Sequence, residues 1–257
     1  MVFYNNRVSI ADVNGKEIYL VRNIDNQLIL NYYSYNGDIV EVILADNFLD
    51  EFDILIKDDD SIYLIYQDKQ YNLNLMIVKG DNRTNHKLTA EKFPKIYELN
   101  LILHNDNLSM IFLYPVKNAH NIFQIEHNLL KDDKWHSYLV DQVRVSQVLN
   151  PIKLINKDEN LFLAYYYENQ ICLKSFSEND GEWKESIVLT DNKEKLYLDM
   201  IYDNGYFHLV YSEAVDGNYI IKYKMFKYNT SLIEEHEADI SRKSNSSNPT
   251  IIKNDDI

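Results

Sequence analysis

Short apolar runs alternate with polar turns along the whole chain, and the runs repeat at a nearly fixed interval. The most regular runs are residues 18–22, 62–66, 108–112, 161–165 and 207–211. Their starts are 44, 46, 53 and 46 residues apart, and a polar turn precedes each one. Self-similarity at a period of this length indicates a repeat architecture in which each repeat is one supersecondary unit.

Each repeat contains four short segments whose apolar patterns differ. The first two segments are almost wholly apolar, as in strands that are covered on both faces. The third and fourth alternate, as in residues 222–226, Lys-Tyr-Lys-Met-Phe. Alternation indicates one covered face and one face in water. Buried inner strands followed by half-exposed outer strands are the pattern of a β-propeller blade, counted outwards from the axis.

The sequence therefore predicts an all-β fold, a β-propeller of four-stranded antiparallel blades that forms a single domain over residues 1–257. The repeats are expected near residues 8–47, 52–92, 96–143, 151–190 and 196–241, with a partial sixth at 249–257. We expect five blades, with six as the alternative. Because residues 249–254 repeat the opening of the fourth unit at 151–156, we also expect the chain to be part of a longer protein.

Composition supports strands that are joined by Asn and Asp turns. The chain has 21 Tyr and 10 Phe, which suit a pleated sheet, but only 6 Gly and 4 Pro. Asn and Asp must then supply most of the turns, since their side chains bond to nearby backbone and tolerate the left-handed conformation.

Charge and cysteine content narrow the function classes. The formal net charge of −14 disfavours nucleic acid as a partner, because an acidic surface repels phosphate. Cys172 is the only cysteine and lies in an apolar run, so we interpret it as an inert buried thiol.

Without a signal-peptide pattern or a run of 18 apolar residues, we expect a cytoplasmic protein with no membrane partner. No metal-ligand spacing, phosphate loop or nucleophile elbow occurs, so we predict no cofactor, no metal and no catalytic residue.

The hairpin at residues 177–183 reads Ser-Glu-Asn-Asp-Gly-Glu-Trp. It resembles the Asp box of sialidase-like propellers, which runs Ser, any, Asp, any, Gly, any, Thr, Trp. Asn179 stands where the box has Asp, the Thr is missing, and Trp183 comes one residue early; residues 131–135 carry a fainter echo. The resemblance implies a structural turn between third and fourth strands. A sialidase would also need an arginine cluster and a Tyr–Glu pair, and the five arginines of this chain are scattered in sequence.

One repeat position, the last residue of the second strand, supplies the candidate binding residues. They are Arg22, Tyr66, Tyr165 and Tyr211. Tyrosine at strand ends suits stacking on sugar rings, and it equally suits protein interfaces. We predict a non-catalytic binding or scaffold module with a protein partner, and not an enzyme. The alternative is a glycan-binding, lectin-like protein or a diverged sialidase-like glycoside hydrolase.

Overall fold

A computed structural model describes residues 8–13, 17–25, 27–34, 36–57, 59–145, 151–229, 231–241 and 249–252. The chain divides into two compact units. The amino-terminal unit comprises residues 2–115 and 126–137, and the carboxy-terminal unit comprises residues 116–125 and 138–257.

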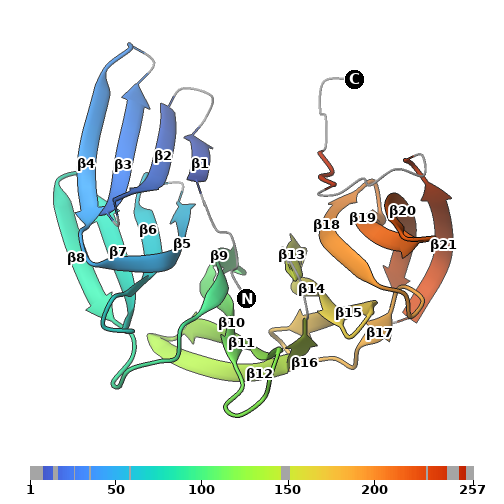
Figure 1. Ribbon diagram of the computed structural model, residues 1–257. Helices are drawn as coiled ribbons and strands as arrows, with labels where there is room; N and C mark the ends of the chain where they lie inside the picture. The colour runs from blue at the N-terminus through green and yellow to red at the C-terminus, as the bar shows by residue number, and fades with distance from the viewer. Residues whose placement is uncertain are drawn as a thin grey trace. The chain divides into compact units, whose positions relative to one another are not determined.

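The described residues form five antiparallel sheets and no helix, and the main strands of each sheet lie side by side in sequence order (Figure 1). The amino-terminal unit contains two complete sheets. The first is β1 (Val8–Val13), β2 (Glu17–Ile24), β3 (Gln27–Ser34) and β4 (Ile39–Ala45). The second is β5 (Phe48–Ile56), β6 (Ile62–Asp68), β7 (Leu73–Lys79) and β8 (Asn82–Lys87).

The third sheet contributes strands to both units. It is β9 (Tyr97–His104), β10 (Asn107–Pro115), β11 (Ile122–Lys131) and β12 (Lys134–Arg144). The carboxy-terminal unit contains the last two sheets. The fourth is β13 (Ile152–Lys157), β14 (Asn160–Tyr167), β15 (Gln170–Ser177), β16 (Glu182–Trp183) and β17 (Ile187–Val188). The fifth is β18 (Lys195–Asp203), β19 (Tyr206–Val215), β20 (Asn218–Asn229) and β21 (Ser231–Asp239).

The predicted repeat of four antiparallel strands is confirmed, with local corrections. β5 begins at Phe48, before the expected repeat boundary, because Phe48 and Phe52 are both buried and pack edge to face, with ring centroids 5.5 Å apart. β12 continues to Arg144, one residue beyond the expected end of the third repeat. Residues 249–252 form no strand, and the rest of the expected partial sixth repeat, residues 253–257, lies outside the described residues. The sixth repeat stays a prediction.

Asp and Asn fill the turns as predicted. Fifteen described non-glycine residues have a positive φ, and eleven of them are Asp or Asn. The turn between β11 and β12 consists of Asp132 and Asp133, with φ of 51° and 59°. Two consecutive left-handed residues form a type I′ turn, whose twist matches that of the flanking strands. The abundant Asp and Asn residues thus serve the geometry of the hairpins.

Two hydrophobic cores of the amino-terminal unit lie on opposite faces of the second sheet. One contains Val21, Leu28, Phe48, Phe52, Leu64 and Tyr66, and the other contains Ile65, Leu75, Leu99, Leu101, Leu108 and Phe112. Adjacent residues of β6 therefore point into different cores, because successive side chains of a strand point to opposite faces. This two-sided burial explains why the second strand of each repeat is almost wholly apolar.

Carboxylates also join the first strands of neighbouring sheets. The Asp53 carboxylate on β5 accepts a hydrogen bond of 2.7 Å from the backbone N–H of Leu101 on β9. In the carboxy-terminal unit, Asp199 on β18 forms an ion pair of 2.7 Å with Lys153 on β13. Asp53 and Asp199 thus each bond across to the first strand of a neighbouring sheet.

In the carboxy-terminal unit, aromatic rings fill the space between the fourth and fifth sheets. Phe162 on β14 packs against Phe207 on β19 at 4.9 Å between ring centroids. Phe207 stacks on Phe226 of β20 at 5.3 Å, and the Tyr202 ring of β18 meets the Phe207 ring edge to face at 5.0 Å. Phe207 is 1% exposed and touches rings from three other strands, so it anchors this interface.

We expect Phe207→Ala to lower the free energy of unfolding by about 3–5 kcal/mol, because it leaves a cavity at the centre of the ring cluster. Urea denaturation would measure the loss. Tyr167→Ala is the matched control, since Tyr167 is 47% exposed and should cost much less. Equal losses for the two variants would contradict the assignment of Phe207 as an anchor.

A buried histidine pair in the third sheet predicts a pH dependence of stability. His127 on β11 lies 3.2 Å from the Ser109 hydroxyl, and burial, with the nearby His104, lowers the pKa of His127 to about 3. The histidine is therefore neutral in the folded state, whereas in the unfolded chain it protonates near its ordinary pKa of 6.5. The contribution of the neutral His127 to the free energy of unfolding is complete above pH 6.5 and is lost as the pH falls from 6.5 towards 3.

Between pH 6.5 and pH 5.5, we expect wild-type stability to fall relative to that of His127→Asn by about 1 kcal/mol, since one pKa unit is worth ~1.4 kcal/mol. Urea denaturation of both proteins across this range would test it. A difference between the two proteins that does not change with pH would contradict the buried neutral histidine.

Candidate functional site

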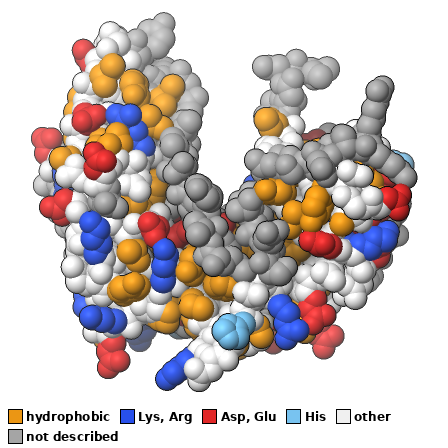
Figure 2. All heavy atoms as spheres, in the orientation of Figure 1, with side chains coloured by type: hydrophobic (Ala, Val, Ile, Leu, Met, Phe, Trp, Pro, Cys, Tyr) orange, Lys and Arg blue, Asp and Glu red, His pale blue; other side chains and the backbone are white. Residues whose placement is uncertain are grey.

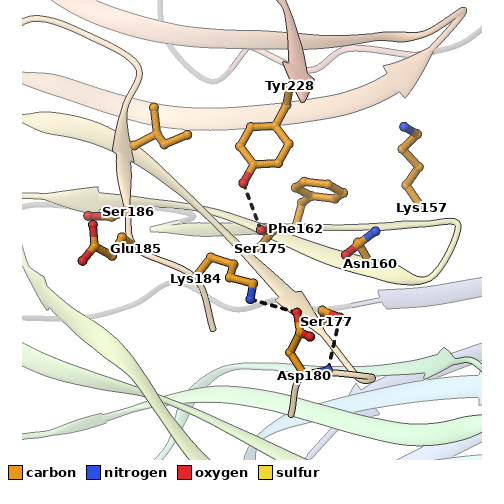
Figure 3. Close-up of a pocket in the computed structure, with 11 residues that line it drawn as sticks. Lys157, Asn160, Phe162, Ser175, Ser177, Asp180, Lys184, Glu185, Ser186 and Tyr228 are labelled. Carbon is orange, nitrogen blue, oxygen red and sulfur yellow. Dashed lines mark hydrogen bonds and ion pairs between the residues drawn. The ribbon is translucent and has the colours of Figure 1, made fainter. Parts of the chain in front are cut away.

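A pocket of about 580 Å³ lies in the carboxy-terminal unit, between the fourth sheet and strand β20 of the fifth (Figure 3). We call it the Tyr228 pocket. It is lined by Lys157, Asn160, Phe162, Ser175, Ser177, Asp180, Lys184, Glu185, Ser186, Ile187 and Tyr228. Its size falls within the range of pockets that hold small molecules.

The inner wall of the Tyr228 pocket comes from paired strands. Phe162 on β14 is directly opposite Ser175 on β15, so both side chains lie on the same face of the sheet. The Tyr228 hydroxyl lies 3.1 Å from the Ser175 Oγ, and its ring meets the Phe162 ring edge to face at 5.3 Å. This wall therefore presents aromatic surface together with two hydroxyl groups.

The outer strand of the fourth sheet is interrupted at the pocket. β15 pairs with β16 through Phe176 and Trp183, and with β17 through Leu173 and Ile187. Between these pairs, three outer residues face only two residues of β15, which is a β-bulge. The bulge consists of Lys184, Glu185 and Ser186, and all three line the pocket. The fourth strand of this repeat is thus divided into β16 and β17 at the pocket.

The hairpin between β15 and β16 sets the position of Asp180. The Asp180 N–H donates to the Ser177 hydroxyl at 3.4 Å, and the Gly181 N–H donates to the Ser177 carbonyl at 2.9 Å. Gly181 has φ of +67°, a conformation that glycine adopts at low cost. Lys184 Nζ lies 2.8 Å from the Asp180 carboxylate, and its hydrogen bond lowers the pKa of that group (Figure 3). Asp180 is therefore ionised at neutral pH.

Lys157 and Asn160 border another side of the pocket, from the hairpin between β13 and β14. Lys157 Nζ lies 4.2 Å from the centroid of the Tyr202 ring and 3.4 Å from the Asp158 carboxylate. The hydrogen bond with Tyr202 is the main reason that the pKa of Lys157 is raised. Both lysines of the pocket are thus protonated and held by neighbouring groups.

Of the four residues that the sequence singles out, two lie in the amino-terminal unit. Arg22 donates from Nε to Asn31 at 2.9 Å and from Nη2 to Glu41 at 3.3 Å, both within its own sheet. Tyr66 is 5% exposed, and its hydroxyl accepts a hydrogen bond of 3.2 Å from Asn85. Arg22 thus belongs to a partly solvated polar group, whereas Tyr66 belongs to the core.

The other two, Tyr165 and Tyr211, lie in the carboxy-terminal unit and are each 1% exposed. The Tyr165 hydroxyl donates 2.6 Å to Asp141 of β12, and burial raises its pKa. The Lys195 Nζ lies 5.9 Å from the Tyr211 ring centroid. Neither residue lines the Tyr228 pocket. A binding role for the four residues stays a prediction.

Sequence reasoning missed the residues of the Tyr228 pocket, apart from the hairpin at 177–183, which was interpreted as a structural turn. A usable signal was the polar insertion Lys184-Glu185-Ser186, which interrupts the alternation expected of a fourth strand. Tyr228 carries no such signal, since it is one of 21 tyrosines.

Two further properties of the described residues concern other kinds of site. No group of three or more His, Cys, Asp or Glu side chains among them could hold a metal ion. They also include no helix long and apolar enough to cross a membrane. Acidic and basic side chains are interspersed on the face drawn in Figure 2, so the net charge forms no single-sign patch there.

No protein-family model matches the chain, and no curated protein does. Solved structures are similar to it. The polysaccharide lyase Uly1 is 10% identical with a TM-score of 0.58, over 91% of this chain and 72% of that one. A streptogramin B lyase is 14% identical with a TM-score of 0.51, over 94% and 71%. An exo-β-1,3-galactanase from Phanerochaete chrysosporium is 11% identical with a TM-score of 0.46, over 75% of this chain, which spans only 50% of that protein's length.

At these identities the likeness shows the fold, and the predicted β-propeller is confirmed; a specifically sialidase-like Asp box is not shown. The prediction of a non-catalytic scaffold, and of a chain that is not an enzyme, is wrong in the light of these comparisons. The neighbours are enzymes, and one of them is a lyase of polysaccharides. They lend no support to a protein partner. The sequence misled because propeller sites gather side chains from separate strands, which leaves no local motif.

We expect Tyr165→Phe to destabilise the protein by about 1.5–3 kcal/mol, because it removes a hydrogen bond to a carboxylate. Its neighbour gives the matched control. Tyr166 is also 1% exposed, but its hydroxyl has no hydrogen-bond partner in the described part of the chain, so Tyr166→Phe should cost nothing or stabilise. Thermal and urea denaturation would compare them, and a greater loss for Tyr166→Phe would refute the assignment.

Proposed function

We propose that this chain is a carbohydrate-active β-propeller that binds a glycan in the Tyr228 pocket and cleaves its glycosidic bond there. The observation that carries the proposal is that aromatic rings, hydroxyl groups and two carboxylates line one pocket, which is large enough to hold a sugar. Aromatic faces stack on the apolar faces of sugar rings, and polar side chains bond to sugar hydroxyls. The fold, shared with a polysaccharide lyase, is in keeping with this proposal.

Asp180 and Glu185 are the residues that we propose for the chemistry. Glycosidic cleavage uses two carboxyl groups, one that protonates the leaving oxygen and one that is ionised and acts as base or nucleophile. Asp180 suits the second role, because Lys184 lowers its pKa and keeps it ionised. Glu185 projects from the β-bulge at the pocket and would supply the proton.

Release of reducing ends from a panel of polysaccharides would test the proposal. Wild type should cleave at least one member, and Asp180→Asn and Glu185→Gln should each reduce kcat by about 100-fold or more, the usual worth of acid–base catalysis. Tyr228→Ala should mainly raise KM, because it removes a stacking surface.

Asp216→Asn is the control, since Asp216 lies in the turn before β20, about 30 Å along that strand from Tyr228 at ~3.3 Å per residue. It should retain the wild-type rate. Cleavage that survives both carboxyl variants would overturn the assignment of residues. Binding without cleavage would overturn the catalytic part and favour the lectin-like alternative.

A further inference from the structure

We infer that the Tyr228 pocket selects neutral glycans over uronate-containing or sulfated ones, an inference that rests on the proposed function. It concerns the charges that surround the pocket. An acidic sugar needs a cation to replace the water around its carboxylate or sulfate, and arginine is the residue best suited to that task. No arginine is among the described residues that line the pocket.

The two lysines of the pocket are already engaged by carboxylates. Lys184 Nζ lies 2.8 Å from Asp180 and 3.1 Å from Glu182. Lys157 lies 3.4 Å from Asp158 and over the Tyr202 ring. An anionic sugar would have to displace a carboxylate of the protein from either lysine. Binding would gain little free energy, because the lysine would only exchange one anionic partner for another.

The two hairpins that border the pocket, residues 157–160 and 177–187, carry an excess of negative charge. They contain six carboxyl groups and two lysines, a formal net charge of −4, or −3 while Glu185 holds the proton that it is proposed to donate. The hydrogen bond from Lys184 lowers the pKa of Asp180, so protonation does not relieve this charge near neutral pH. Like charges brought together across an interface are strongly unfavourable, so a polyanion is repelled as it approaches.

The same groups suit a neutral sugar. Carboxylates and serine hydroxyls accept hydrogen bonds from sugar hydroxyls, and the Asn160 amide donates and accepts. Tyr228 offers its ring together with a hydroxyl held 3.1 Å from Ser175.

The choice of a neutral glycan also determines the class of reaction. Elimination by a lyase requires a uronate carboxylate to acidify the neighbouring C–H, so a neutral glycan leaves hydrolysis, with water adding across the broken glycosidic bond.

Calorimetric titration with tetrasaccharides of equal length would test the inference. The probes are cello-, xylo- and galactotetraose as neutral glycans and tetragalacturonate as the acidic one. We expect at least one neutral tetrasaccharide to bind about tenfold or more tightly than tetragalacturonate. Raising NaCl from 50 mM to 1 M should leave the neutral Kd unchanged and improve the acidic one, because salt screens repulsion.

Tetragalacturonate that binds more tightly than every neutral probe, with an affinity that falls as salt rises, would overturn the inference and leave the proposed glycan site standing. Absence of binding to all four probes would overturn both.

A charge variant gives a second measurement. Asp180→Asn releases Lys184 from one partner, so affinity for tetragalacturonate should rise about two- to fivefold, the worth of an exposed ion pair. Asp216→Asn removes the same charge from a distant turn. It should leave the affinities for tetragalacturonate and for the neutral tetrasaccharides unchanged. An equal gain from the two variants would show that only net charge matters, and would overturn the role given to the Asp180–Lys184 pair.

Discussion

A sheet whose inner strands are apolar on both faces cannot be stable alone, and this constraint governs the whole chain. β6 points Leu64 into one core and Ile65 into the other, so the second sheet needs cover on both sides. The rings of Phe162, Phe207 and Phe226 meet the same need between the fourth and fifth sheets. Stacked repeats bury a continuous core that no single repeat can bury, which is why the four-stranded unit recurs.

The outer strands need less cover on their two faces than the inner strands do. The Tyr228 pocket lies beside an outer strand, where this need is smallest. β8 is exposed along its entire length, and the outer edge of the fourth sheet is reduced to two strands of two residues each. A bulge there costs little packing, and its residues 184–186 line the pocket. Polar chemistry can therefore occupy the outer part of a repeat while the inner strands keep their apolar sequence.

Much of the fold was predictable from the sequence, whereas most of the site was not. Apolar runs, their period and the Asn/Asp turns follow from local rules that each residue obeys independently, so the repeats could be recognised. The pocket depends on the juxtaposition of Tyr228 with Ser175, which are 53 positions apart. The repeat position that yields Tyr66, Tyr165 and Tyr211 is buried, because an aromatic residue at the end of a two-sided strand is needed for packing. The tyrosine that recurs at this repeat position therefore indicated a core position.

Strand β15 shows how one segment serves both purposes. Lys174 points to one face, where it pairs at 3.0 Å with Asp141, the carboxylate that also accepts the Tyr165 hydroxyl. Ser175, the next residue, points to the other face and bonds with Tyr228 in the pocket. Because side chains alternate along a strand, a charged network that fixes β15 on one face holds the pocket wall on the other. One wall of the pocket thus lies on a strand that is held from its other face, whereas the bulge and the hairpins supply other lining residues.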